Sequence, residues 1–437
     1  MKILPQPDDQ LTPSFCRLRL AMWILLVLLH LITSFHRVSI NVMADLLMAE
    51  FSLTGVALGN LSAAYTYMYL VMQLPGGVLV DRLGPRKIAL LTGMTMAIGS
   101  LMIGFAPTAW MFFLGRLTIG LGGSVILINI FKFQATWFRR NEFATMSGIA
   151  LFTSSIGTLV AATPLAISIA AFGWRVSFIF FALVTFAVAA FGYFRIRNEP
   201  ADESCRKALA NDENGSHIKP VPVLAAIKQS LGNRSIWLLV LINTGTYGGM
   251  MVLSGTWGIS YLVHSYGFTV AKASYFIISA LLGYMFGAPV IGYISDRVGS
   301  QKKLVIITAI CYLSAWLGII AWPGGFIPEY FIFLLFFLLG FGSAGTMLTF
   351  PMARRVSPPG FTGSITATVN LGIFLGIAIL QPLVGYLLDF NWDGLVVEGA
   401  RVYPLVAYRY GFLPCLIFAF MALAAVICFR EKKVREH

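Results

Sequence analysis

The hydrophobic residues of this chain fall into long uninterrupted runs that are separated by short polar segments. Each run is about 19–27 residues long, which lets a helix cross the ~30 Å hydrocarbon core of a lipid bilayer. A transmembrane β-barrel would instead show short segments in which polar and apolar residues alternate. We therefore predict twelve helical spans, at residues 20–43, 57–80, 88–106, 110–133, 145–171, 175–194, 236–263, 270–294, 303–322, 329–350, 361–387 and 409–429.

The composition also indicates a protein that crosses the membrane many times. Hydrophobic residues make up 58% of the 437 positions and charged residues only 11%, and the mean hydropathy is +0.81. Soluble proteins carry about a quarter charged residues. The first run is too long for a signal-peptide core, so we expect it to be retained. We predict a bacterial inner-membrane protein embedded in the lipid bilayer.

The net charge of +13 is explained by membrane topology and not by binding to nucleic acid. With the N-terminus inside, the outer segments hold only four cationic residues, Arg175, Lys272, Arg401 and Arg409. The others fall in inner segments or within spans. Because cytoplasmic loops are enriched in Lys and Arg, we predict that both termini are cytoplasmic.

The sequence contains no motif typical of catalysis or of cofactor binding. Its five cysteines have neither a disulfide pattern nor a zinc-ligand spacing. Residues 340–345 fit G-x-G-x-x-G, but they lie inside an apolar span with no strand before them, so they do not predict a dinucleotide site. We expect neither an enzyme nor a bound cofactor or metal.

An internal repeat divides the chain into two related halves. The charged loop at 77–87 returns 215 positions later at 292–303, and the glycine-rich residues 120–124 return at 340–344. A repeat of this length predicts two homologous units of six spans each. The fold class is then an all-α polytopic membrane protein with 12 transmembrane helices in two pseudo-symmetric six-helix bundles. The bundles cover residues 1–194 and 236–437, and the polar segment 195–235 forms a cytoplasmic linker.

The repeated loop resembles the signature of the major facilitator superfamily, Gly-x-x-x-Asp-Arg-x-Gly-x-(Lys/Arg)-(Lys/Arg). The matching residues are Gly77, Asp81, Arg82, Gly84, Arg86 and Lys87, with echoes at Gly292, Asp296, Arg297 and Gly299. The resemblance implies a loop that latches the inner side while the protein is open outward. We carry this role to Asp81 and Arg82, with Gly77, Gly84, Arg86, Asp296 and Arg297 as further latch residues. A simple basic turn is the alternative.

The first span contains the strongest candidate for ligand binding. A helical period places His30, Ser34, Arg37 and Asn41 on one narrow face. An arginine inside a membrane helix costs at least ~2.5 kcal/mol, so it is tolerated where it faces a bundle interior or a water-filled path. Arg37 is therefore a candidate anchor for an anion. The alternative is an arginine that extends to the lipid headgroups.

Other polar residues within the spans extend this candidate site. All acids fall in loops or at span ends, so the charges fixed inside the membrane are cationic and favour an anionic ligand. Tyrosines on the second span are expected to contact either this ligand or neighbouring helices. Lys132 is interpreted as a cytoplasmic-end residue. The predicted substrate contacts are Arg37, His36, Asn41, Tyr65, Tyr69, Gln73, Arg116, Trp257, Asn370 and Gln381.

The segment Phe35-His36-Arg37-Val38-Ser39 is similar to the first span of the anion:cation symporter branch of this superfamily. The resemblance implies that Arg37 holds the carboxylate of the substrate. In that branch, two acidic residues usually couple transport to protons. At the corresponding positions this chain has His36 and Gly123 instead. Either His36 takes over this role, since imidazole titrates near neutral pH, or its ring is satisfied by a hydroxyl or backbone partner.

These features predict a monomeric secondary transporter that takes up a small organic anion by alternating access, with a proton or sodium ion as the coupling ion. Two alternatives remain. Gly148, Gly157 and Pro164 in span five loosely resemble an exporter motif, which would favour a drug or metabolite efflux pump. The other alternative is a transporter-like sensor or assembly protein that binds its ligand without transporting it.

Overall fold

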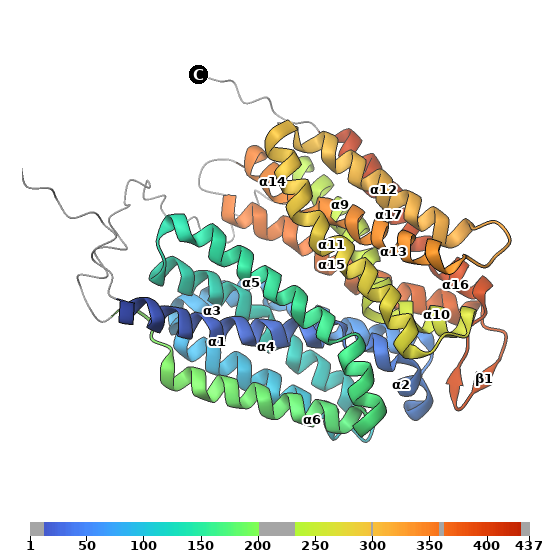
Figure 1. Ribbon diagram of the computed structural model, residues 1–437, viewed down its shortest axis with the longest axis horizontal. Helices are drawn as coiled ribbons and strands as arrows, with labels where there is room; N and C mark the ends of the chain where they lie inside the picture. The colour runs from blue at the N-terminus through green and yellow to red at the C-terminus, as the bar shows by residue number, and fades with distance from the viewer. Residues whose placement is uncertain (1–12, 201–231, 299, 358–361, 430–437) are drawn as a thin grey trace, which may run out of the picture.

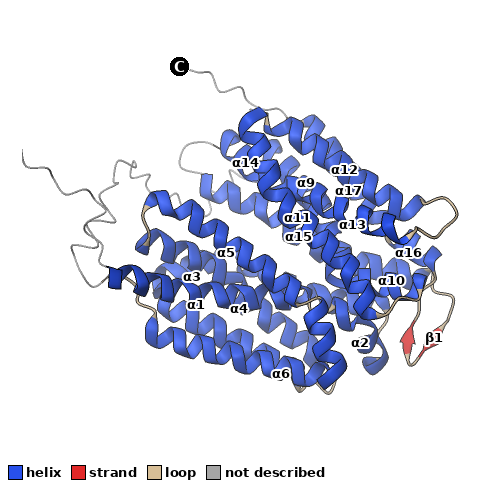
Figure 2. Ribbon diagram, in the orientation of Figure 1, coloured by secondary structure: helices blue, strands red, loops and turns tan. Residues whose placement is uncertain are grey.

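The computed structural model describes residues 13–200, 232–298, 300–357 and 362–429, and nearly all of them are helical (Figure 2). The first half of the molecule holds α1 (Pro13–Val38), η2 (Asn41–Met43), α2 (Ala44–Phe51), α3 (Gly55–Gly104), α4 (Ala109–Trp137), α5 (Arg140–Val160) and α6 (Thr163–Arg195). The second half holds α9 (Arg234–Val252), the π-helical turn η3 (Leu253–Trp257), α10 (Gly258–Tyr266), α11 (Val270–Val298), α12 (Gln301–Ala321), α13 (Glu329–Ser343), η4 (Ala344–Leu348), α14 (Thr349–Val356), α15 (Thr362–Phe390), β1 (Val396–Val397), β2 (Ala400–Arg401), α16 (Leu405–Gly411) and α17 (Leu413–Cys428).

Ten helical stretches of the described residues are long and apolar enough to cross a membrane, which confirms an all-α polytopic membrane protein. The count of twelve spans stays a prediction. The predicted span 57–80 and most of the predicted span 88–106 fall within α3, and between them the chain turns at Gly84, which has φ +74°. An L side chain would be strained at this φ, whereas glycine adopts it readily.

The structure shifts the boundaries of several predicted spans, including the first and the fifth. The span predicted at 20–43 ends at Val38, and the span predicted at 145–171 is broken between α5 and α6 at Ala161 and Ala162. Pro164 explains the second break, because it lies in the first turn of α6, where its missing N–H costs no hydrogen bond. Inside one continuous helix it would interrupt the hydrogen bonding.

Helix packing repeats between the halves at positions that the sequence repeat relates. A side chain at Gly120 of α4 would meet the backbone of Tyr65 in α3, and a side chain at Gly340 of α13 would meet the backbone of Ala280 in α11. Small residues let membrane helices approach this closely. The boundaries predicted for the two bundles and the linker remain predictions, and residues 201–231 of the linker lie outside the described residues.

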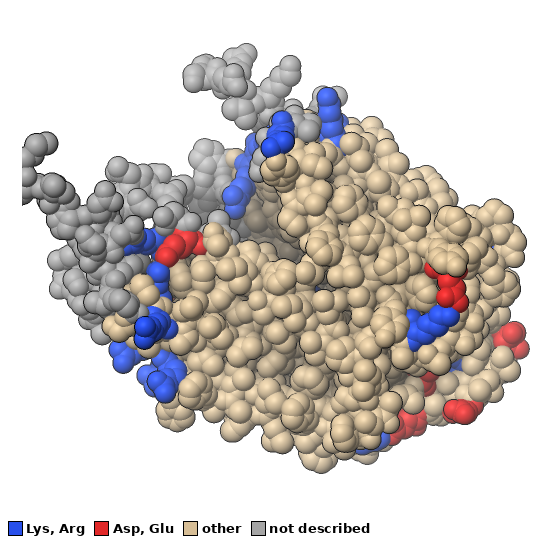
Figure 3. Space-filling model, in the orientation of Figure 1, with Lys and Arg blue, Asp and Glu red and all other residues tan. Residues whose placement is uncertain are grey.

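The halves contact each other at the end of the molecule that carries α2, α10 and the β-hairpin (Figure 1). We call this the outer end, following the predicted topology. There α2 packs against β2, and α3 packs against α15. At the opposite, inner end the helices of the two halves diverge, and Figure 3 shows the surface hollowed between them. Most of the Lys and Arg residues visible in that view gather around the inner end.

Candidate functional site

Arg37 lies in the last turn of α1 and is partly buried. Within the part of the chain that the structure describes, it has no hydrogen-bond or ion-pair partner, and its Nε is buried without one. Its guanidinium lies within electrostatic range of four phenol groups, those of Tyr65, Tyr69, Tyr247 and Tyr284. Two of these tyrosines belong to α3 of the first half and two to α9 and α11 of the second half. Tyrosines of both halves therefore surround the guanidinium of Arg37.

Aromatic contacts hold these tyrosines in place. The rings of Tyr65 and Tyr69 have centroids 5.9 Å apart, and Tyr69 stacks on Phe374 of α15 at 4.0 Å. Tyr247 meets Tyr284 edge to face at 5.4 Å. A tyrosine held in this way presents a hydroxyl that can donate or accept a hydrogen bond while its ring stays fixed. The site can thus bind an anionic group at the arginine and polar groups at the phenols.

Tyr247, Tyr284 and Phe374 were not among the residues predicted to contact substrate. Tyr247 follows the polar stripe of span seven, at a helical spacing that matches the stripe on span one, so the sequence did carry a signal for it. Tyr284 and Phe374 lie in glycine-containing apolar stretches, where an aromatic residue is expected to pack against helices. Their positions near Arg37 depend on how the two halves meet.

Arg116 has different surroundings from Arg37. Its side chain is 0% exposed, and its guanidinium donates to the backbone carbonyl of His36 and, at 2.9 Å, to that of Ser62. Its guanidinium carbon lies 5.6 Å from the centre of the Tyr65 ring. Arg116 therefore ties α4 to α1 and α3, and both of its terminal nitrogens are occupied by the protein itself.

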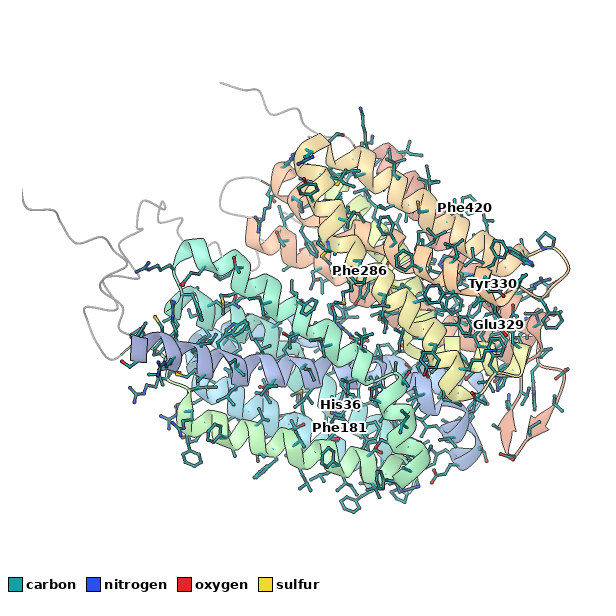
Figure 4. All side chains as sticks on the ribbon, in the orientation of Figure 1. His36, Phe181, Phe286, Glu329, Tyr330 and Phe420 are labelled. Carbon is teal, nitrogen blue, oxygen red and sulfur yellow. The ribbon has the colours of Figure 1, made fainter. Side chains whose placement is uncertain are left out.

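The two histidines of α1 point in different directions. The ring of His36 is 0% exposed and packs against Phe35 and Phe178, at centroid distances of 5.2 and 5.8 Å. Figure 4 shows it beside Phe181, on the side of α1 that faces α6. His30 is also buried, and neither of its ring nitrogens has a partner among the described residues. His30 lies within electrostatic range of Arg37, so it shares the face of the arginine.

Asn41 and Trp257 lie where the halves meet at the outer end. The amide nitrogen of Asn41 donates to the carbonyl of Ser254 at 2.7 Å, and its oxygen accepts from the backbone N–H of Ile259 at 3.2 Å. Trp257 is 0% exposed, and its indole donates to the carbonyl of Gln381 at 3.3 Å. Asn41 is thus occupied in joining the first half to the second.

Gln73 and Asn370 lie on the inner side of the tyrosines. Both are partly buried, and the side-chain oxygen of Gln73 has no partner among the described residues. Because α3 and α15 run antiparallel and Tyr69 stacks on Phe374, Gln73 and Asn370, each one turn further toward the inner end, come to a similar level. The structure therefore places both on the inner-end side of the tyrosines that surround Arg37.

The loop that carries the predicted latch lies at the inner end. Asp81 forms an ion pair with Lys132 of the same half at 2.9 Å. Arg86 donates from Nε to the carbonyl of Tyr193 at 2.7 Å, and a side chain at Gly84 would meet Asn198. Among the remaining predicted latch residues, Arg82 and Arg297 are exposed. A side chain at Gly77 would meet no described atom within 4 Å. The side chain of Asp296 lies outside the described part of the chain.

Comparison with known families gives a consistent picture. The model of the Major Facilitator Superfamily matches residues 26–279 and 239–437. The uncharacterized transporter YybO of Bacillus subtilis is 27% identical over 400 residues, which cover 86% of this chain and 89% of the relative. The probable galactarate/D-glucarate transporter GarP of Escherichia coli K12 is 26% identical over 439 residues, which cover 89% of this chain and 94% of the relative.

Similar folds occur among solved structures. A bacterial homologue of the human lysosomal transporter Spinster, in an inward-facing and unoccupied conformation, matches with a TM-score of 0.76. The match covers 95% of this chain and 99% of that one at 15% identity. The nucleoside transporter NupG matches with a TM-score of 0.69 at 13% identity and covers 94% of this chain and 100% of its own. At these identities the likeness shows the fold alone.

Proposed function

Because this chain belongs to the Major Facilitator Superfamily, we propose that it is a secondary active transporter that moves a small organic anion across the membrane by alternating access. It is a multi-pass membrane protein with the fold of transporters. We further propose that it works in the bacterial inner membrane with both termini in the cytoplasm. In that orientation the structure corresponds to a state that is closed outside and open inside.

The observation that carries this proposal is the guanidinium of Arg37, which has no partner among the residues that the structure describes and lies among four tyrosines of both halves. An arginine fork binds a carboxylate with two parallel hydrogen bonds, and such a pair recovers much of the hydration that a buried carboxylate loses. A ligand held by Arg37 and by Tyr247 or Tyr284 would contact both halves at once. Such contacts can link occupancy of the site to the relative motion of the halves.

Related proteins support the choice of substrate class. Relatives are named as transporters of galactarate and D-glucarate, of hexuronate and of sulfoacetate. Each of these molecules carries a carboxylate, and all but sulfoacetate also carry several hydroxyl groups. We propose that the substrate of this chain is likewise a small, polar carboxylate-bearing solute. We propose uptake by symport with a proton or sodium ion, by a single chain that acts as a monomer.

The test begins with a thermal-shift screen of the purified protein against galactarate, D-glucarate, glucuronate and sulfoacetate. A ligand at 100 times its Kd should stabilise the protein by ~2.7 kcal/mol. The compound with the largest shift is then used in counterflow with proteoliposomes. We expect counterflow in the wild type, and equal counterflow in Arg195→Ala, which removes an exposed arginine at the inner end of α6.

Arg37→Lys is the most informative variant in this assay. Lysine keeps the charge but loses the fork, so we expect weak counterflow if a carboxylate is bound at Arg37. Undiminished counterflow in Arg37→Lys and Arg37→Ala would contradict the role of Arg37. Binding without counterflow would favour the sensor, and accumulation of a drug in a deletion strain would favour the efflux pump.

A further inference from the structure

Asp389, near the end of α15 in the second half, binds the start of α3 in the first half. Its two carboxylate oxygens accept hydrogen bonds from the backbone N–H groups of Gly55 and Val56, at 2.7 and 2.8 Å. The carboxylate of Asp389 in the second half thus accepts hydrogen bonds from the main chain of the first half. No residue at this contact was predicted from the sequence to have a function.

The start of α3 needs such an acceptor. The first amides of a helix have no partner within the helix, and the helix dipole favours a negative charge beside them. Thr54 satisfies the N–H of Ala57 at 3.1 Å from within the first half. The N–H groups of Gly55 and Val56 are satisfied by Asp389 while the halves touch at the outer end. Water can replace the carboxylate when they separate, so the contact is reversible.

Two outer residues of the second half keep Asp389 in position. Arg401 donates to Asp389 at 3.1 Å, and the phenol of Tyr403 donates to it at 2.8 Å. Burial, together with the charge of Asp389, raises the pKa of Tyr403. The phenol therefore stays protonated and remains a donor. Asp389 is oriented by its own half before it meets the first half.

The helices that Asp389 joins pack closely over their outer parts. A side chain at Gly385 would meet the backbone of Gly55, and a side chain at Gly59 would meet the backbone of Gln381. About two turns beyond Gly55 toward the inner end, Ser62 and Thr256 share a hydrogen bond of 2.5 Å between the halves. The outer end is thus closed by direct backbone approach, and Asp389 lies at its margin.

The antiparallel pairing of α3 and α15 places a second acid at the opposite end. Asp81 lies in α3, further toward the inner end than Tyr69. Because Tyr69 stacks on Phe374 and the two helices run in opposite directions, Asp81 lies at the level of the start of α15. In this structure Asp81 pairs with Lys132 of its own half instead. The outer acid is engaged across the halves, and the inner acid is engaged within one half.

We propose that Asp389 is an outer latch, which holds α3 against α15 while the inner end is open and releases when the transporter opens outward. The proposal rests on alternating access as given under Proposed function. It assigns to Asp389 a positioning role, since the carboxylate contacts no part of the Arg37 site. Asp81 and Asp389 would then act at opposite ends of one helix pair, in opposite states of the cycle.

The test measures how often the outer end opens. Thr256→Cys places a thiol inside the outer contact, at a position that is 0% exposed. In whole cells, a membrane-impermeant maleimide should label this cysteine only when the outer end is open, and the parent without Thr256→Cys gives the background. We expect Asp389→Asn to raise the labelling rate about tenfold, because a charged acceptor of two amides is lost.

Asp393→Asn is the matched control. Asp393 is an exposed acid four residues further on, and its carboxylate accepts from the N–H of Leu395 at 3.2 Å within the second half. This variant should leave the labelling rate unchanged. An unchanged rate in Asp389→Asn, or an equal rise in both variants, would overturn the proposal.

Val56→Pro keeps the test decisive if Asp389→Asn does not fold. Proline fits the first turn of a helix but has no N–H, so this variant removes one of the two donors to Asp389 and should also raise labelling of Thr256→Cys. An unchanged labelling rate in folded Val56→Pro protein would also contradict the latch. The readout requires no substrate, so a failure of the anion proposal would appear in counterflow, and a failure of the latch would appear in labelling.

Discussion

Arg19, Arg37 and Arg116 of the first half are all buried or partly buried, and each has different surroundings. Arg19, near the inner end of α1, forms an ion pair with Glu142 at 2.8 Å. Arg116 is bound by two backbone carbonyls. Arg37 has neither an acid nor a carbonyl partner among the described residues. A cation that the fold does not neutralise is available to a ligand, and this difference separates the candidate site from structural charges.

The largest effect should come from Arg116→Ala. Truncation would remove two buried hydrogen bonds that the charged guanidinium donates to the carbonyls of His36 and Ser62, and a hydrogen bond to a charged group contributes about 1.5–3 kcal/mol. We expect a large fall in the thermal unfolding temperature of the detergent-purified protein and in the yield of monodisperse material. Wild-type stability in Arg116→Ala would erase the distinction between Arg116 and Arg37.

Arg37→Ala should have the opposite profile. The protein should fold with wild-type thermal stability, because no hydrogen bond or ion pair of the described chain is lost. Binding of the carboxylate ligand should weaken about 100-fold, which corresponds to about 2.7 kcal/mol. Calorimetric titration with the ligand found in the thermal-shift screen measures this change. A destabilised variant would indicate that Arg37 is a structural residue like Arg116.

Tyr247→Phe should have a smaller effect on the same site. It removes one hydroxyl within electrostatic range of Arg37 and keeps the edge-to-face contact with Tyr284. Loss of one hydrogen bond to a ligand costs about 0.5–1.5 kcal/mol, so we expect the Kd to rise about 2- to 10-fold. Tyr312→Phe serves as a control, since its hydroxyl donates to the carbonyl of Gly245 within the second half.

The smallest effect is expected at the Arg19–Glu142 pair. Partial burial raises the pKa of Glu142, but hydrogen bonds from Arg19 and from the N–H of Arg139 lower it by more than burial raises it. The pKa of Glu142 therefore lies below its ordinary value. Glu142 therefore stabilises the fold at pH values above the pKa of an unfolded glutamate, and this contribution disappears as the pH falls through the lowered pKa. We expect Glu142→Gln to cost about 0.5–1 kcal/mol at pH 7, and less in acid. Thermal unfolding of both proteins across pH measures the difference, and a constant difference would contradict the assignment.

The sequence was sufficient to predict the features that depend on a single helix. Run length predicted the membrane helices, and the helical period predicted that His30 and Arg37 share a face. Pro164 shows where this reasoning is limited, because its position allowed either a kink or a new helix, and the tertiary structure selected a new helix.

Features that depend on contacts between helices could not be predicted in this way. The partners of Arg116 are main-chain carbonyls of two other helices, and nothing in the types of those residues signals them. The helical period predicts that His36 lies about 100° around the helix from Arg37, but the packing of its ring against Phe178 depends on where α6 lies. Tyr284 reaches the site because the second half packs against the first.

The donors at the outer latch belong to the peptide backbone, and this has a consequence for how the contact can vary among descendants of this chain. Most amino-acid replacements at position 56 would keep the N–H that Asp389 binds. Substitutions at position 56 therefore leave the hydrogen bonds to Asp389 intact, whereas replacement of Asp389 itself removes them. Proline is the exception, since it fits the first turn of a helix but has no N–H, so its appearance at position 56 would identify lineages in which the N–H of Gly55 alone holds the carboxylate.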